Sequence, residues 1–233
     1  MKIEVCINRL EDLIAVQSLK VDRVELCVEI GCGGLTPSIA FVEKALEISI
    51  IPIHVLVRPR SGHFFYTKEE LDCIERDCLY FNSMGVAGIV TGMLTRELNL
   101  PLSFLQQLRD KLVNTCLVFH RAFDEVNKPE EALKELSRIG FDGVLTSGQY
   151  ATAAAGIEAL SNWRKQMKNR MFILPGGGIN ASNCRLFTSH DFEWIHLSAK
   201  KREDTKLHSK FNHPTFGLDE AMIGKVISQL KKD

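Results

Sequence analysis

Two short stretches of the sequence each pair a carboxylate with a thiol. Ile3-Glu4-Val5-Cys6 stands near the start of the chain, and Val24-Glu25-Leu26-Cys27 repeats its pattern 21 residues later. Side chains two residues apart on a β-strand point to the same face. A carboxylate suits acid–base chemistry, and a thiolate suits a soft metal ion. Two consecutive strands would therefore aim both kinds of group at one place.

Further groups suited to acid–base chemistry follow other apolar runs. Glu25, His120 and Asp124 are the candidate catalytic residues, if the protein is an enzyme. Each also has a structural interpretation. A histidine on a strand is often a hydrogen-bonded core residue, and Glu25 can serve only to anchor a neighbouring arginine in a buried ion pair.

A second set of residues is suited to binding an anion. Arginines and glycines gather after the later apolar runs, and backbone N–H groups of glycine-rich turns can hold a phosphate. The candidate anion-binding residues are Arg58, Arg60, Arg121, Ser147, Gly176, Gly177, Gly178 and Ser198. The alternative for the glycines is a plain turn into a helix.

Short apolar runs alternate with longer amphipathic segments along the whole chain. We predict strands at Ile3–Ile7, Arg23–Cys27, Ile53–Arg58, Gly88–Thr91, Cys116–Arg121, Gly143–Ser147, Met171–Leu174 and Trp194–Ser198. We predict helices at Ser38–Glu47, Lys68–Met84, Pro101–Val113, Pro129–Ile139, Ala151–Met167, Ala181–Thr188 and Asp219–Leu230. This alternation predicts a single-domain α/β fold, a (β/α)8 TIM-type barrel spanning residues 1–233, with its working face at the C-terminal ends of the strands. A doubly wound open sheet is the alternative, but the first strand-to-helix turn, Asn8-Arg9-Leu10-Glu11, lacks the glycines that such folds often carry there.

The composition excludes several classes of protein. Lys+Arg and Asp+Glu number 29 each, so the net charge is zero, and no basic block favours nucleic-acid binding. No run approaches the roughly 18 apolar residues of a membrane span, and the first residues lack the apolar core of a signal peptide. The seven cysteines include no C-x-x-C motif. We therefore expect free thiols in a reducing cytoplasm.

A series of motifs resembles one known family. In order along residues 3–199 they are VELC, GGLTPS, RPRSG, VTG, FHRAFD, VLTSG, PGGGI and HLSA. This series is similar to that of the CutC family, which is named for copper homeostasis. The resemblance implies a TIM-like barrel and cytoplasmic copper handling. It also implies that Cys6 and Cys27 match a pair of cysteines proposed to hold Cu(I) in family members.

Two thiolates on adjacent strands fit what Cu(I) prefers. Adjacent parallel strands lie about 4.8 Å apart, so Cys6 and Cys27 could approach one ion in a linear or near-linear site. The alternative is that both thiols are small core residues. The protein would then be an enzyme, or a non-catalytic binding protein, acting on an anionic small molecule with a phosphate or carboxylate group at the barrel mouth. We also expect a homodimer, because barrels of this kind often pair.

Two features depart from the family pattern. Cys32 stands where relatives commonly carry Glu, and it places an extra thiol in the loop after the second strand. The segment 200–217 is shorter than the usual loop after the eighth strand. His208 and His213 in this segment are interpreted as part of a charged loop rather than as metal ligands, and such a loop could act as a lid.

Overall fold

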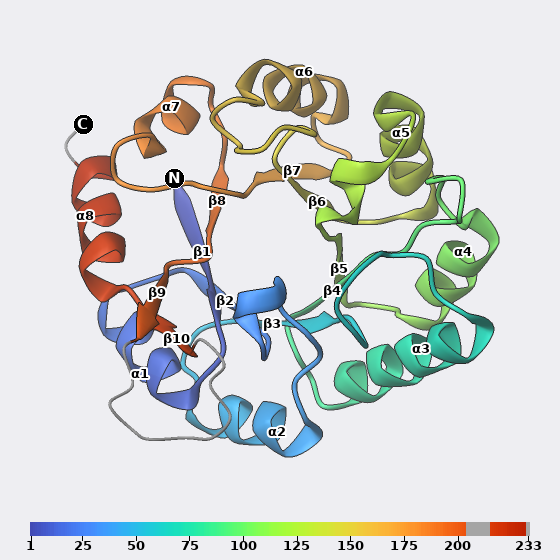
Figure 1. The fold of residues 1–233 in the computed structure, drawn as a ribbon, viewed down its shortest axis with the longest axis horizontal. Helices are drawn as coiled ribbons and strands as arrows, with labels where there is room; N and C mark the ends of the chain where they lie inside the picture. Colours follow the sequence, from blue (N-terminus) through green and yellow to red (C-terminus); the bar gives the residue numbers. More distant parts are fainter. Residues whose placement is uncertain (204–214, 232–233) are drawn as a thin grey trace.

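Eight parallel strands form the centre of the molecule, seen end-on in Figure 1. The computed structural model describes residues 1–203 and 215–231. The strands are β1 (Lys2–Ile7), β2 (Arg23–Leu26), β3 (Ile53–Val57), β4 (Gly88–Thr91), β5 (Cys116–Phe119), β6 (Gly143–Thr146), β7 (Phe172–Pro175) and β8 (Trp194–Leu197). All eight overlap the runs predicted from the sequence, so the barrel prediction is confirmed.

The strands pair in an order that nearly closes the barrel. The sheet runs β7-β6-β5-β4-β3-β2-β1-β8, so β1 lies between β2 and β8. The gap between β7 and β8 is closed by a single bridge between Gly176 and His196. The register places Cys6 of β1 opposite Glu25 of β2, and Glu4 opposite His196 of β8. Three strands that are consecutive around the barrel therefore bring their polar residues to the same levels.

Helices cover the outside of the barrel (Figure 1). They are α1 (Leu10–Ser18), α2 (Ile39–Ile48), α3 (Lys68–Ser83), α4 (Leu102–Lys111), α5 (Pro129–Ile139), α6 (Ile157–Met167), α7 (Cys184–Ser189) and α8 (Glu220–Leu230), with the short 3-10 helices η1 (Ile30–Cys32) and η2 (Arg121–Glu125) at strand ends. Local sequence signals set several of the ends. Thr67 and Glu70 form a capping box at the start of α3, and α5 begins at Pro129 and ends before Gly140, whose φ of 98° is left-handed.

Two sequence predictions differ from the structure. The helix expected over Ala151–Met167 begins only at Ile157, because the preceding residues cover the turn after β7, where the Ala153 N–H donates to the Gly177 carbonyl at 2.9 Å. The segment 200–217, expected to be a loop, contains two antiparallel strands, β9 (Lys200–Glu203) and β10 (Thr215–Leu218). His208 and His213 lie outside the described residues.

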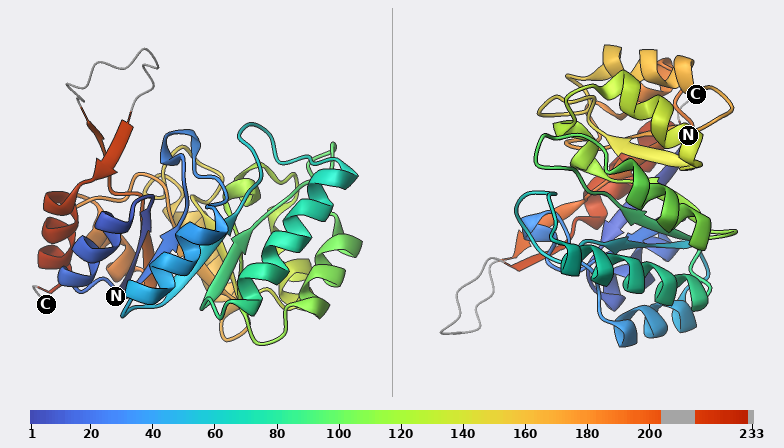
Figure 2. Two further views of the ribbon diagram at one scale, coloured as in Figure 1. Left: turned by 90° about the horizontal axis from the view of Figure 1, so that it is seen from below. Right: turned by 90° about the vertical axis from the view of Figure 1, so that its right-hand side faces the viewer.

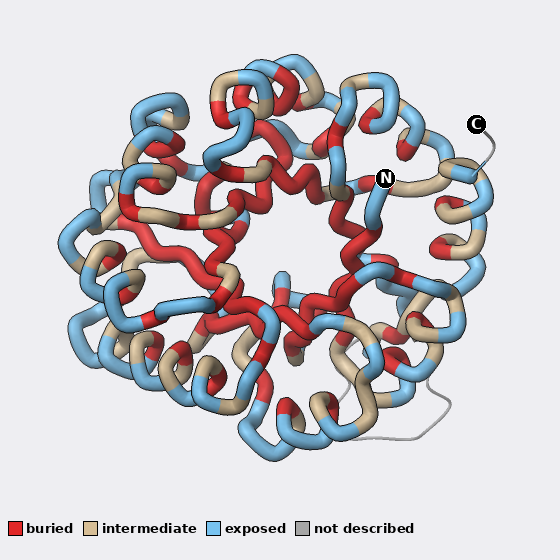
Figure 3. The backbone as a smooth tube through the Cα atoms, turned by 180° about the vertical axis from the view of Figure 1, so that it is seen from behind, coloured by how far each residue is buried: buried red, intermediate tan, exposed pale blue. Residues whose placement is uncertain are grey.

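The apolar core has two parts. Buried backbone positions line the barrel strands and the inward sides of the helices (Figure 3). The larger part fills the layer between the barrel and its helices and contains most of the buried Val, Ile, Leu and Phe side chains. The smaller part lies inside the barrel and consists of Cys6, Cys27, Ile30, Leu56, Val90, Val118, Leu145 and Leu174. Both thiols of the motif pair are thus interior residues, as period-two alternation along β1 and β2 predicts.

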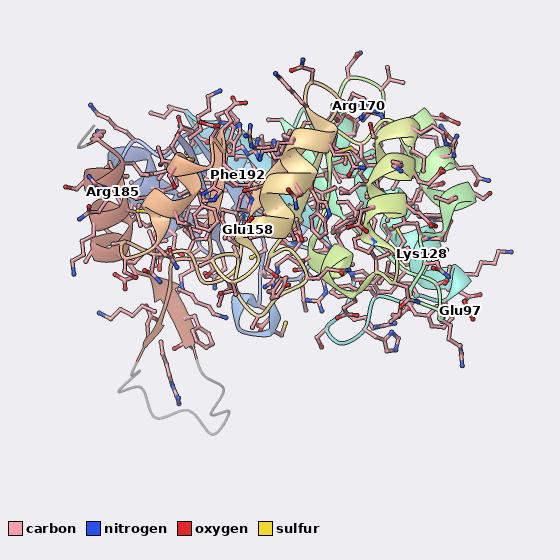
Figure 4. The ribbon with its side chains drawn as sticks, turned by 90° about the horizontal axis from the view of Figure 1, so that it is seen from above. Glu97, Lys128, Glu158, Arg170, Arg185 and Phe192 are labelled. Carbon is pink, nitrogen blue, oxygen red and sulfur yellow. The ribbon has the colours of Figure 1, made fainter. Side chains whose placement is uncertain are left out.

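The two ends of the barrel differ in what surrounds them. The β9–β10 strands project beyond the barrel on the side that also carries η1 (Figures 2 and 4). Glu158, at the start of α6, lies toward this side in Figure 4, and Arg170, just before β7, lies at the opposite end. Within residues 1–203 and 215–231, no helix has both the length and the apolar character needed to cross a membrane.

Candidate functional site

A cavity of about 520 Å³ opens at the C-terminal ends of the strands. This is the end at which TIM-type barrels carry their binding sites. Its lining includes residues from strands and loops all around the barrel: Cys6, Glu25, Ile30, Cys32, Gly33, Leu56, Arg58, Phe64, His120, Arg121, Asp124, Glu125, Leu145, Gly177, Gly178, His196, Ser198 and Lys200. Most of the residues predicted from the sequence therefore meet in one cavity.

Cys6 and Cys27 lie side by side beneath this cavity. Their sulfur atoms are 3.3 Å apart, and both residues are buried. A linear site with metal–sulfur bonds of about 2.3 Å would need the sulfurs roughly 4.6 Å apart. The sulfurs as placed would instead hold an ion to one side of the line between them, so the linear geometry expected from sequence does not match this arrangement. The hydrogen bond with Cys27, together with burial, raises the pKa of Cys6 well above its ordinary value of 9.0.

Cys6, Glu25 and His196 form a group that could hold a metal ion. One ligand atom from each of these buried residues lies within 4.8 Å of those of the other two. The Nδ1–H of His196 donates to the Glu4 carboxylate at 2.7 Å, which leaves Nε2 facing Glu25 at 3.9 Å. A carboxylate on the far nitrogen of a ligand histidine is a typical outer-shell feature of metal sites, because it fixes the ring and its tautomer.

Glu4 is the centre of a buried charge network. It accepts a hydrogen bond from Arg23 Nε at 2.5 Å and lies 3.8 Å from His54. Burial alone would raise the pKa of Glu4, but the His196 hydrogen bond and the Arg23 charge outweigh it and lower that pKa to about 2. Burial raises the pKa of Glu25, and the nearby Glu4 charge adds to that effect. The pKa of His196 is also raised, because its hydrogen bond to Glu4 and the Glu25 charge outweigh the opposing effect of burial.

Aromatic rings close the barrel interior beside this network. The Arg23 guanidinium lies 3.9 Å from the Trp194 ring centroid and 5.4 Å from that of Phe172. These cation–π contacts hold a charge inside the barrel where water is excluded. The network therefore lies between the metal-binding group and the end of the barrel at which the strands begin. A ligand would reach the group from the cavity at the other end.

His120 lines the cavity as a buried imidazole. Its Nδ1 accepts a hydrogen bond from the Ala122 N–H at 3.1 Å, so the neutral ring carries its proton on Nε2. Burial and the nearby Arg58 charge lower the pKa of His120 to about 3. At neutral pH this imidazole is thus an uncharged hydrogen-bond donor.

Asp124 organises the loops after β5 and β6. Its carboxylate accepts hydrogen bonds from the Thr146 hydroxyl at 2.5 Å, from the Ser147 N–H at 3.0 Å and from the Gln149 N–H at 3.2 Å. It also pairs with Arg121 at 2.8 Å. The Ser147 hydroxyl accepts a hydrogen bond from Arg121 Nη2 and lies within hydrogen-bond distance of Asp124 and the Tyr150 carbonyl, and Ser147 is not part of the cavity lining.

The three candidate arginines lie in different surroundings. Arg58 and Arg121 line the cavity, whereas Arg60 lies outside it, bound to Glu70. Arg60 faces a separate cavity of about 530 Å³ formed by the loops after β3 and β4. The Arg121 side chain is 44 % exposed, and a Cβ added to Gly177 would lie only 3.3 Å from its guanidinium, so the cation lies against the glycine turn.

The glycine turn after β7 also divides between two roles. Gly177 and Gly178, with φ of 107° and 72°, line the cavity together with Ser198. Left-handed backbone of this kind favours glycine. Gly176 does not line the cavity, and it forms the bridge to β8 instead. Cys32, the additional thiol, is an exposed member of the lining.

Comparison with known proteins settles the family. Residues 1–201 match the family model described as CutC family. The chain belongs to the CutC family. It is 34 % identical over 210 residues to a CutC family protein of Glaesserella parasuis, covering 90 % of this chain and 86 % of the relative. It is 37 % identical over 201 residues to that of Pasteurella multocida, covering 86 % and 82 %. The solved CutC structure from Streptococcus agalactiae superposes with a TM-score of 0.80 at 29 % identity, covering 85 % of this chain and 98 % of that one.

Two members of the network in this CutC chain, His196 and Arg23, were not candidate site residues in the sequence analysis. Together with Glu4, to which the first motif points, they hold the network together. Alternation along the eighth strand was the available signal, since it places Trp194, His196 and Ser198 on one face. The pairing of β8 with β1, which barrel closure requires, then brings His196 beside Glu4.

The two buried neutral histidines of this CutC protein predict acid sensitivity. Burial lowers the pKa of His54 from 6.5 to about 4 and that of His120 to about 3. The unfolded chain therefore binds more protons below pH 6.5, so stability is full above that pH and is lost as pH falls toward the folded pKa values. We expect a loss of about 2 kcal/mol per histidine between pH 7 and pH 5, measured by urea unfolding.

The control for this prediction is the variant His120→Gln, which removes one of the two groups. Its loss of stability between pH 7 and pH 5 should be about half that of the native protein. His196 acts in the opposite sense, because its raised pKa stabilises the fold at low pH and that contribution is lost as pH rises. Equal unfolding free energies at the two pH values would contradict the assignment of neutral, buried imidazoles.

Proposed function

We propose that this protein binds Cu(I) through Cys6 and Cys27, with His196 completing a bent site beneath the cavity. The observation that carries the proposal is the 3.3 Å separation of two buried thiols beside a histidine that is already oriented by Glu4. Thiolate and imidazole are ligands that suit a soft ion. The name of the related CutC protein from Streptococcus agalactiae refers to copper homeostasis, which supports the choice of ion.

Binding at this centre must release protons. The pKa of Cys6 is raised by its hydrogen bond with Cys27 and by burial, and that of His196 is raised by Glu4. Metal ligands bind in their deprotonated forms, so affinity should rise with pH as these groups give up protons to the solvent. Cys6 and His196 line the cavity, which gives the ion a path to the thiols.

The test is a Cu(I) titration against a competing chelator under anaerobic, reducing conditions. We expect tight binding of one ion per chain in the native protein and loss of that binding in Cys6→Ser with Cys27→Ser. Cys73→Ser is the matched control, because Cys73 is an exposed thiol on α3. Tight binding that survives in the double variant would show that the paired thiols are core residues only.

The cavity also favours a second candidate function, the binding or conversion of an anionic small molecule. The specific observation is that the guanidinium of the exposed Arg121 side chain lies against the Gly177 turn at the rim of a 520 Å³ space. Such a volume suits a small metabolite. A thermal-shift screen of phosphorylated and carboxylated metabolites tests the proposal, with Arg121→Met expected to lose the stabilisation. A pH profile of turnover then separates an enzyme from a binding protein.

A further inference from the structure

Two residues of the cavity lining, Arg58 and His120, and Tyr66, whose hydroxyl lies close to the Arg58 side chain, each have a buried polar atom without a hydrogen-bond partner among the described residues. The atoms are Arg58 Nε, the Tyr66 hydroxyl oxygen and His120 Nε2. Their residues are only 7 %, 4 % and 5 % exposed. A buried polar group without a partner destabilises a fold, and these three lie around one guanidinium, which favours a ligand from outside the chain.

Arg58 is held so that one donor remains available. Its Nη1 donates to the carbonyls of Cys32 at 3.0 Å and Gly34 at 3.1 Å, and its Nη2 donates to that of Gly62 at 3.0 Å. These contacts fix the guanidinium between the loops after β2 and β3. Nε is left for another acceptor, and the positive charge is retained.

The other two groups surround this charge. The ring of His120 lies against Gly92, where an added Cβ would be 2.5 Å from Nδ1, and its tautomer leaves Nε2–H as a donor. Burial raises the pKa of Tyr66, and the neighbouring Arg58 charge partly offsets this, so the phenol stays protonated at neutral pH. The ring of Phe64 covers both sides, 5.0 Å from the His120 ring and 5.1 Å from the Arg58 guanidinium.

We propose that Arg58, Tyr66 and His120 form a subsite for the carboxylate of a small organic acid, with Phe64 as its cover. This inference rests on the second function proposed above and names its ligand class. A carboxylate carries one charge and two oxygens, which match one guanidinium and the two neutral donors. A phosphate dianion would keep an extra charge and oxygen unpaired in this buried place, and it fits the open Arg121–Gly177 rim better.

Phe64 also controls the access of a ligand to this subsite. It lines both the 520 Å³ cavity and the neighbouring 530 Å³ cavity, so its ring stands between the two spaces. Rotation of this one side chain would open the space next to His120 and Arg58, the two groups that its ring contacts. The ligand therefore extends from a carboxylate under Phe64 toward the centre of the larger barrel cavity.

The test uses protein labelled with ¹⁵N in its histidines and follows the His120 Nε2–H signal during titration with acetate. His120→Gln identifies the signal by its loss. We expect a saturable shift with acetate and none with inorganic phosphate at equal ionic strength. Binding should weaken at least tenfold in Arg58→Lys and several-fold in Tyr66→Phe, which removes only the hydroxyl. Arg138→Lys is the matched control, because Arg138 is exposed on α5 and pairs there with Glu135.

Each other outcome overturns the proposal in a different way. Unchanged acetate affinity in Tyr66→Phe and in a folded Arg58→Lys would show that the subsite is elsewhere, while the second function would stand if Arg121→Met still abolished ligand binding. A stronger response to phosphate would refute the carboxylate class. No response to acetate, with stabilisation by other anions, would show that the three groups hold only water. No response to any anion would reject the second function as well.

Discussion

Replacing Glu4 by alanine is expected to lower the free energy of unfolding by about 3–5 kcal/mol. Glu4 is 1 % exposed and is shared by Arg23 at 2.5 Å and His196 at 2.7 Å. Its removal leaves a buried guanidinium without its anion, and a charge in that position has no water to solvate it. The loss should appear in urea unfolding at pH 7.

The matched control for this prediction is Glu193→Ala. Glu193 also pairs with a cation, Lys2 at 3.0 Å, but its side chain is 67 % exposed. Exposed pairs contribute about 0–1 kcal/mol, so this variant should be close to the native protein. Similar losses in the two variants would mean that the interior pair is no better sheltered from solvent than the surface one.

The second large expected effect is that replacing Cys6 and replacing Cys27 change the affinities for Cu(I) and Zn(II) differently. Cys6 shares the 4.8 Å group with Glu25 and His196, whereas Cys27 is not a member of that group and its sulfur lies 3.3 Å from that of Cys6. Zn(II) accepts sulfur, nitrogen and oxygen ligands, but Cu(I) prefers thiolates. We therefore expect Cys6→Ser to lower the affinity for both ions by about 100-fold or more. Cys27→Ser should lower the affinity for Cu(I) far more than that for Zn(II).

Competition titrations with each metal check this difference. Cys73→Ser should leave both affinities unchanged, because Cys73 lies on the surface of α3. Equal losses of Zn(II) affinity in the Cys6 and Cys27 variants would mean that both thiols bind that ion, which would contradict the three-residue group. Loss of Cu(I) affinity only with Cys6→Ser would mean that Cys27 is a core residue.

The fold could be predicted from the sequence because its local signals agree with its tertiary structure. Apolar runs such as Val55–Val57 and Ile89–Val90 are buried on both faces, as strands of a parallel barrel must be. Glycine after helix α5 and proline at its start fixed that helix to within a residue. Ala151–Gly156 misled the prediction because alanine favours helix, while here tertiary contacts with the Gly177 turn prevail.

The candidate site was predictable only where alternation along one strand was enough. Cys6, Glu25 and Cys27 follow from period two, and the structure brings them together as expected. Arg60 shows the limit of the argument. Like Arg58, it follows strand β3, but it pairs with Glu70 outside the barrel mouth. Glu70 is positioned by the capping box at the start of α3.

The protonation state of His120 was beyond sequence reasoning for a different reason. A histidine at a strand end is equally consistent with a base and with a neutral donor. The choice depends on the Ala122 N–H, which meets Nδ1 only because η2 turns directly after β5. Burial beside Arg58 then excludes the charged form. Both facts are properties of the loop conformation rather than of residue type.

The single bridge between Gly176 and His196 has a consequence for amide exchange and for entry to the interior. A ladder with one bridge opens with less free energy than a fully paired one, so amides along the β7–β8 boundary should exchange with deuterium faster than those between β3 and β4. His196 stays joined to β1 during such opening. We therefore expect local opening between β7 and β8, beside the buried His196. A metal ion held by β1, β2 and β8 would lie on one side of that opening and would not hold β7 and β8 together.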